Sequence, residues 1–172
     1  MEIRLDQVTL EETDSRLTAT PEELQPDLEL AKLCSDVEYR LVHHRVDKEI
    51  FLSGRVSFIL EFTCARCLEN YRRNFLVPLN LVLQLVAEEQ MEDADETDDE
   101  FIPYPESKPV YNLDRHLRDL ITLEVPMKPL CRDDCAGLCS QCGANLNNSS
   151  CNCRTERTDP RWEGLRRLGN EN

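Results

Sequence analysis

The chain has 172 residues, of which 40% are hydrophobic, and its formal net charge is −14. This length allows one domain with its own hydrophobic core, and the absence of any apolar run near the ~20 residues that cross a bilayer excludes a membrane-spanning helix. Residues 1–6 also lack a basic and then apolar leader, so we expect a cytoplasmic protein with no membrane partner.

Much of the negative charge comes from one segment. Nine acidic residues lie between Glu88 and Glu100, and the rest of the chain has a net charge of only −5. This segment has almost nothing to bury, so we predict a mobile acidic loop over residues 88–100 that interrupts the domain. The remaining surface is therefore not expected to repel phosphate groups as a whole.

The N-terminal third predicts one strand and one short helix. Residues 1–10 alternate apolar and polar at Ile3 and Leu5 before the pattern shifts, which favours an opening strand with a break. Thr20 is followed by Pro21 and, three residues on, by Glu23. This order is typical of a capping box with proline in the first helical turn, and Pro26 is expected either to end or to restart the helix that follows.

The central part of the chain predicts consecutive antiparallel strands. Apolar residues recur at every second position from Val37 to Leu41 and from Val56 to Phe62. From Phe75 to Leu85 six apolar residues follow one another at period two, which is typical of a strand. The short stretch from Cys64 to Cys67 would then be the turn that links the two longest strands.

Two further helices are predicted near the C-terminus. Leu113, Leu117, Leu120 and Ile121 share one helical face between residues 112 and 124, with Asn112 as the N-cap. Residues 159–169 begin with Asp-Pro and end with glycine, which indicates a short final helix. Together these elements predict an α+β fold, mainly an antiparallel β-sheet with two or three short helices and a Cys-rich zinc-binding C-terminal segment. We expect residues 1–130 to form the β-rich domain and residues 131–172 to pack on the same domain.

Cysteine is the most informative residue type in this chain. Eight of the nine cysteines form close pairs, namely Cys64/Cys67, Cys131/Cys135, Cys139/Cys142 and Cys151/Cys153. Two thiolates on a tight turn can both reach one ion at about 2.3 Å, and two such turns complete a tetrahedron around Zn²⁺. Gly143, directly after Cys142, is typical of a zinc knuckle. The ninth cysteine, Cys34, is expected to be an ordinary core or surface residue.

The four pairs can combine into two sites in three ways. Nearness in the sequence favours one site from Cys139, Cys142, Cys151 and Cys153, because closing a short loop costs little chain entropy. The other four cysteines would then form a site that ties the tail of the chain to the central turn. A single C-terminal site, iron–sulfur ligation and thiol-redox chemistry are the alternatives, so the expected cofactor is one or two Zn²⁺.

Catalysis has little support in this sequence. The chain contains no G-x-S-x-G, G-x-G-x-x-G or GK[ST] motif, which are the usual signatures of hydrolases, dinucleotide enzymes and P-loop proteins. None of its three histidines has ligand spacing to a cysteine. We therefore expect no catalytic residues and a structural role for the metal.

Several motifs occur together in this chain, namely C-A-R-C-L, the run L-E-V-P-M-K-P-L-C, then G-L-C-S-Q-C-G-A-N-L-N, C-N-C and D-P-R-W-E-G-L-R-R-L. Together they resemble the YceD family of large-ribosomal-RNA-subunit accumulation proteins, and the resemblance spans roughly residues 37–168. The resemblance implies a non-catalytic factor in ribosome biogenesis that supports the accumulation of large-subunit ribosomal RNA. It also supports metal binding by the paired cysteines.

Charge suggests two kinds of partner. Arginines close to aromatic residues could contact RNA or another partner, and the candidates are Arg66, Arg72, Arg73, Arg154, Arg157, Arg161 and Trp162. This is a modest basic footprint, and an acidic chain suits a basic partner better. We therefore expect a basic ribosomal protein or a large-subunit assembly intermediate, with ribosomal RNA as a further partner. The alternative is a structural zinc-binding protein-interaction module unrelated to RNA.

Overall fold

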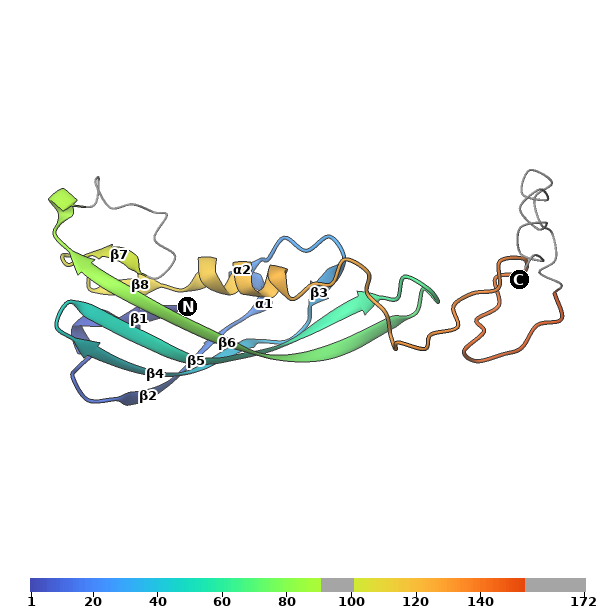
Figure 1. The fold of residues 1–172 in the computed structure, drawn as a ribbon, viewed down its shortest axis with the longest axis horizontal. Coiled ribbons are helices and arrows are strands. Elements are labelled where there is room, and N and C mark those ends of the chain that lie inside the picture. The colour runs from blue at the N-terminus through green and yellow to red at the C-terminus, as the bar shows by residue number, and fades with distance from the viewer. Residues whose placement is uncertain (91–100, 154–172) are drawn as a thin grey trace, which may run out of the picture.

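The computed structural model describes residues 1–90 and 101–153. A long, mainly antiparallel sheet carries the two helices on one face, and the cysteine-rich segment extends from one end of this sheet (Figure 1). The predicted α+β class with an antiparallel sheet is confirmed. Within the described residues, no helix is long and apolar enough to cross a bilayer.

The elements follow one another as short N-terminal strands, a long hairpin and a C-terminal helix. The strands are β1 (Glu2–Arg4), β2 (Thr13–Ala19), β3 (Ala31–Leu33), β4 (Val37–Val46), β5 (Glu49–Thr63), β6 (Asn70–Val86), β7 (Ile102–Pro105) and β8 (Val110–Asn112). The helices are α1 (Pro21–Leu24) and α2 (Asp114–Leu123), with 3₁₀ turns η1 (Leu5–Gln7) and η2 (Glu88–Gln90). The main sheet has the order β2-β4-β5-β6-β7, β3 pairs with β5, and β1 pairs with β8.

The hairpin of β5 and β6 contains the two longest strands of the main sheet. Its strands have 15 and 17 residues and pair antiparallel from Glu49↔Gln84 to Thr63↔Asn70. The predicted alternation is confirmed, since Val56, Phe58, Leu60 and Phe62 are buried while their neighbours in sequence are less so. Cys64 and Cys67 lie in the turn that links these two longest strands, as the sequence predicts.

The core lies between the inner face of this sheet and the two helices. Leu24 of α1 and Leu117 and Ile121 of α2 are fully buried in the same cluster as Tyr39 and Leu60. Toward the cysteine end of the hairpin, Phe62 stacks on Tyr71 with ring centroids 5.5 Å apart, and Tyr71 also packs against the first group of cysteines. The hydrophobic core therefore continues directly into the cysteine-rich region.

The capping box of α1 is confirmed. The Thr20 hydroxyl accepts a hydrogen bond from the Glu23 amide at 3.3 Å, and the Glu23 carboxylate accepts one from the Thr20 amide at 2.8 Å. The helix ends at Leu24, and Gln25 takes a left-handed conformation with φ of 42°. Pro26 therefore follows the helix and does not restart it.

The predicted break in the opening strand lies at Leu5, where η1 begins, because β1 pairs with β8 over only three residues. One predicted boundary is wrong. Asn112 is the last residue of β8 and not the cap of a helix over residues 112–124, because its pairing with Glu2 keeps it extended. Its side-chain oxygen still accepts a hydrogen bond from the Asp114 amide at 2.7 Å. The final helix and most of the acidic loop lie outside the described residues.

Burial of His43 predicts a loss of stability at acidic pH. His43 as a residue is 7% exposed, and its ring Nε2 lies 2.8 Å from the Ser15 hydroxyl. Burial, and secondarily His44, lowers the pKa of His43 below its ordinary value, so the unfolded chain binds a proton more readily than the native one. The free energy of unfolding should therefore fall as the pH drops below about 6.5. Urea unfolding at pH 8 and pH 5 checks this: His43→Gln should weaken the pH dependence, and an unaltered dependence would contradict the assignment.

Candidate metal centres

The first cysteine cluster joins the β5–β6 turn to the loop that follows α2. Cys64 and Cys67 come from the turn and Cys131 and Cys135 from the loop, and the four Sγ atoms lie within 4.8 Å of one another. Cys64 Sγ is 3.8 Å from Cys135 Sγ, and Cys67 Sγ is 3.7 Å from Cys131 Sγ. Four thiolates arranged tetrahedrally at about 2.3 Å from one ion would be about 3.8 Å apart. A disulfide requires about 2.05 Å, so these distances fit a shared metal ion and not a crosslink.

The second cysteine cluster lies within the C-terminal segment. Its sulfur atoms come from Cys139, Cys142, Cys151 and Cys153 and also lie within 4.8 Å of one another. The structure thus groups the eight cysteines into the two sets of four that their nearness in the sequence favoured. The two clusters differ in exposure, because three cysteines of the first are buried whereas Cys142 and Cys153 of the second are exposed.

Both C-x-x-C segments form the same kind of turn. The carbonyl of Cys64 accepts a hydrogen bond from the Leu68 amide at 2.9 Å, and the carbonyl of Cys139 accepts one from the Gly143 amide at 2.9 Å. The residue after the second cysteine has a positive φ in each case, 59° for Leu68 and 73° for Gly143. Gly143 suits this conformation, as the sequence suggested, whereas Leu68 adopts it at a cost in backbone energy.

The turns direct backbone amides toward sulfur. The Gln141 amide donates to Cys139 Sγ at 3.5 Å, and the Arg66 amide donates to Cys64 Sγ at 3.5 Å. Amides of Cys142 and Gln141 lower the pKa of Cys139 to about 6. Burial raises the pKa of Cys131 to about 12, helped by the neighbouring thiols. Four thiolates this close together would repel one another, so they can all be ionised only when a cation lies between them. Each cluster could therefore hold one metal ion.

The arginines proposed as contacts fall into three groups. Arg66 binds the first cluster itself, since its guanidinium donates to the carbonyls of Cys135 at 2.9 Å and Asp133 at 3.2 Å. Arg72 pairs with Glu61 at 3.0 Å, and the Arg73 guanidinium lies 5.5 Å from the centre of the Phe75 ring. Arg154, Arg157, Arg161 and Trp162 lie outside the described residues. Arg66 thus holds the 131–135 loop against the β5–β6 turn.

Asn147 is a supporting residue that the sequence analysis missed. Its Nδ2 donates to Cys135 Sγ at 3.3 Å, while its Oδ1 accepts from the Ala136 amide at 2.8 Å and from Arg132 at 2.7 Å. Asn147 belongs to the loop between Cys142 and Cys151, so it links the loop of the second cluster to a sulfur of the first. The asparagine-rich run from Asn145 to Asn148 was the feature of the sequence that could have indicated this role.

Removing this link should weaken the first cluster. Asn147→Ala deletes an N–H donor to thiolate, and loss of such outer contacts typically costs about 10–100-fold in metal affinity. Competition with a chromogenic chelator measures this. Asn148→Ala is the matched control, because within the described residues the Asn148 side chain makes one hydrogen bond, to the exposed Glu69 carboxylate at 3.1 Å, and none to a cysteine. Equal affinities for the two variants would contradict the role of Asn147.

Comparison with protein families matches residues 52–169 to YceD, described as large ribosomal RNA subunit accumulation protein YceD. This match covers both C-x-x-C turns and all eight clustered cysteines. The chain belongs to the YceD family. No solved structure matches it significantly.

Curated relatives come from plants and mycobacteria. The "Large ribosomal RNA subunit accumulation protein YCED homolog 1, chloroplastic" of Arabidopsis thaliana is 32% identical over 73% of this chain and 45% of its own length. An uncharacterized protein of Mycobacterium tuberculosis is 32% identical over 70% of this chain and 56% of its own length. The maize protein that carries the same name as the Arabidopsis one is 40% identical over 33% of this chain. The chain thus spans about half the length of the first two relatives.

Proposed function

We propose that this chain is a non-catalytic ribosome biogenesis factor that supports the accumulation of large-subunit ribosomal RNA and carries one structural Zn²⁺ in each cysteine cluster. Membership of the YceD family is the observation that carries the proposal, because the family and the matched plant proteins are named for this role. We place the protein in the cytoplasm, where thiols stay reduced and free to bind metal.

The donor sets fit zinc. Each cluster offers four cysteine sulfurs, and soft thiolates in a tetrahedron are the usual ligands of structural Zn²⁺. Four cysteines complete the tetrahedron and leave no position for a reacting water, which supports a structural metal and not a catalytic one. When bound, the ion supplies charge balance for the thiolates, while Arg66 and Asn147 orient the loops that carry them.

Charge supports a basic partner. The chain has a net charge of −14, and a ribosomal protein or large-subunit assembly intermediate rich in lysine and arginine would complement it. Ribosomal RNA is the second partner that we propose, through local basic sites on an otherwise acidic protein.

Complementation tests the function. Cells that lack the chromosomal copy are expected to show a lowered ratio of large-subunit to small-subunit ribosomal RNA, and the wild-type chain should restore it. A Cys64→Ser/Cys67→Ser variant should fail to restore the ratio. Cys34→Ser is the control, because Cys34 lies outside both clusters. An unaltered ratio in cells without the protein would contradict the proposal and would favour an interaction module unrelated to RNA.

A further inference from the structure

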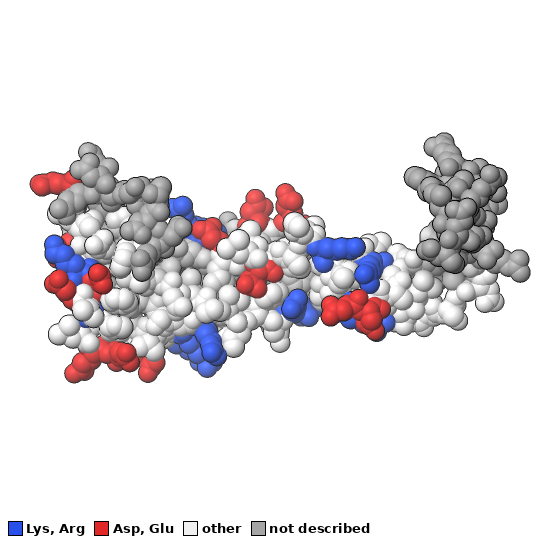
Figure 2. Space-filling model, viewed as in Figure 1, with Lys and Arg blue, Asp and Glu red and all other residues white. Residues whose placement is uncertain are grey.

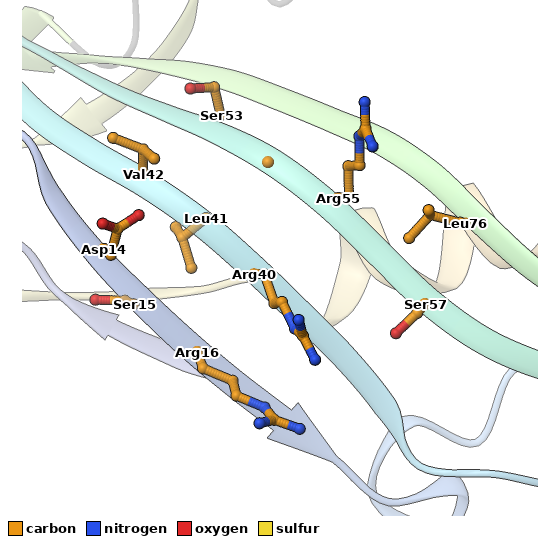
Figure 3. A pocket seen from close by; sticks show the side chains of 11 residues that line it. Asp14, Ser15, Arg16, Arg40, Leu41, Val42, Ser53, Arg55, Ser57 and Leu76 are labelled. Carbon is orange, nitrogen blue, oxygen red and sulfur yellow. The ribbon is translucent and has the colours of Figure 1, made fainter.

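Within residues 1–90 and 101–153, one face of the main sheet is left uncovered. The helices pack on the inner face (Figure 1), whereas the outer face of β2, β4, β5 and β6 carries a hollow of about 860 Å³, whose lining side chains are drawn in Figure 3. On the face of the molecule seen in Figure 2, acidic and basic side chains are interspersed along its length. No single charge dominates that view, so a charged ligand would have to bind where residues of the opposite charge are grouped locally. The charged residues that line the hollow are Asp14, Arg16, Arg40 and Arg55.

The three arginines form a row across three neighbouring strands. Arg16 of β2 is directly opposite Arg40 of β4, and Arg40 is directly opposite Arg55 of β5. Like charges placed directly opposite each other destabilise a sheet, so this register favours an anionic ligand above it. Neighbouring strands are about 4.8 Å apart, so the three backbone positions span roughly 10 Å.

The row is only partly neutralised by the protein. Glu38 bridges two of the arginines, because one of its oxygens pairs with Arg16 and the other with Arg40. Among the described residues, Arg55 has no ion-pair partner, and it is exposed. In Figure 3 its side chain points toward β6, away from the adjacent pair Arg16 and Arg40. Ser53 and Ser57 flank Arg55 on the same face and add hydroxyl donors to the hollow.

An aromatic pair lies on the same open face. His44 and Phe51 are directly opposite each other on β4 and β5, with ring centroids 5.0 Å apart and planes at 8°. His44 is four residues from Arg40, and Phe51 is four residues from Arg55, so the pair shares their face about 13 Å along the strands. Both rings are only half-buried. A half-exposed ring on the same face as phosphate-binding cations is a platform on which an unpaired base can stack.

We propose that this open face binds single-stranded RNA, with Arg16, Arg40 and Arg55 on the phosphates and the His44–Phe51 pair against a base. The inference rests on the proposed role in ribosomal RNA accumulation and names a surface for that partner. Each guanidinium group presents a planar fork of N–H donors that matches the oxygens of a phosphate. The exposed rings favour single-stranded RNA over a duplex, because the bases of a duplex are already stacked on one another. Three guanidinium groups on this face stand against two carboxylates, Asp14 and Glu38, so the face keeps a net positive charge, which favours a polyanion over a basic protein.

Binding to a fluorescent single-stranded RNA of about 20 nucleotides tests the proposal by anisotropy. The Arg16→Gln/Arg40→Gln/Arg55→Gln variant should bind at least about tenfold more weakly at about 0.05 M salt, and its salt slope should be smaller by about 2. The control variant Arg4→Gln/Lys108→Gln/Arg115→Gln removes the same charge from exposed positions outside this face. Phe51→Leu should weaken binding without changing the salt slope.

The results separate this surface from the function of the whole protein. A full-length protein that binds no RNA, or equal weakening in the two triple variants, would overturn the proposed face. If the arginine variant does not fold, as judged by circular dichroism, Arg55→Gln alone serves, because Arg55 makes no ion pair within the described chain. If the arginine variant binds RNA as the wild type does while the wild-type chain restores ribosomal RNA levels in cells, the face is wrong and the function stands.

Discussion

Replacing Cys64 by serine is expected to remove one of two equivalents of zinc and to destabilise the whole domain by at least about 3 kcal/mol. Cys64 is fully buried in the turn between β5 and β6, and its sulfur lies against that of Cys135, 71 residues later in the chain. The first cluster therefore closes a long loop across the end of the sheet. Losing it should free the 131–135 loop and expose Tyr71 and Phe62, which connect the cluster to the core.

The second cluster should behave differently. Cys151→Ser should release the other equivalent of zinc and lower the stability of the sheet to urea much less than Cys64→Ser does, because this cluster joins residues within the 139–153 segment and reaches the first cluster only indirectly, as through Asn147. The more exposed second cluster should also lose metal first when a chelator is added. The Cys34→Ser variant is expected to keep both equivalents of zinc. Equal losses of stability in Cys64→Ser and Cys151→Ser, or no bound metal in the wild type, would contradict this division.

Local sequence patterns predicted most of the fold. The period-two run from Phe75 to Leu85 follows from the pleat of a strand, and its partner Val56 to Phe62 shows the same period. The capping box at Thr20 depends on residues only three positions apart. The four cysteine pairs could be recognised because each turn is local, and chain entropy ranked the ways of combining them correctly.

Features that depend on long-range pairing were not predictable. Whether Asn112 begins a helix or ends a strand is decided by Glu2, more than a hundred residues away in the chain. The arginine row exists only in the register that places Arg16 opposite Arg40 and Arg40 opposite Arg55. The alternation within β4 and β5 places Arg40 and Arg55 on the outer face, but a shift of two residues would keep that face and separate the arginines, and nothing local to each strand excludes such a shift. Asn147 was missed for the same reason, since its sulfur partner belongs to the other cluster.

The hairpin of β5 and β6 places these features at fixed distances from one another. The middle of β5 carries Arg55, the last residue of the arginine row, and the turn of the hairpin carries Cys64 and Cys67. A metal ion bound at this turn would therefore fix the far end of β5, one of the strands that present the proposed RNA-binding face. Loss of the first cluster should consequently weaken RNA binding more than loss of the second does.

Gly54→Ala is expected to have the second large effect, about 3 kcal/mol or more of lost stability. A Cβ atom at Gly54 would lie 2.1 Å from the Arg40 carbonyl oxygen and 2.7 Å from the Leu41 Cα. Both contacts are to the backbone of β4, which cannot rotate away as a side chain could. The strands would have to separate at the pair Leu41↔Gly54, next to the register that aligns Arg40 with Arg55.

Ser53→Ala is the matched control, because Ser53 is the exposed neighbour of Gly54 on the same strand, and we expect its effect to stay within about 0.5 kcal/mol. Urea unfolding measures both variants. The zinc content of folded Gly54→Ala should remain at two equivalents, since the cysteines lie beyond the end of β5. Its affinity for single-stranded RNA should fall, because separating β4 from β5 breaks the row. A Gly54→Ala protein as stable as Ser53→Ala would show that the strands do not approach as closely as the structure requires, and would remove the physical basis for the aligned arginines.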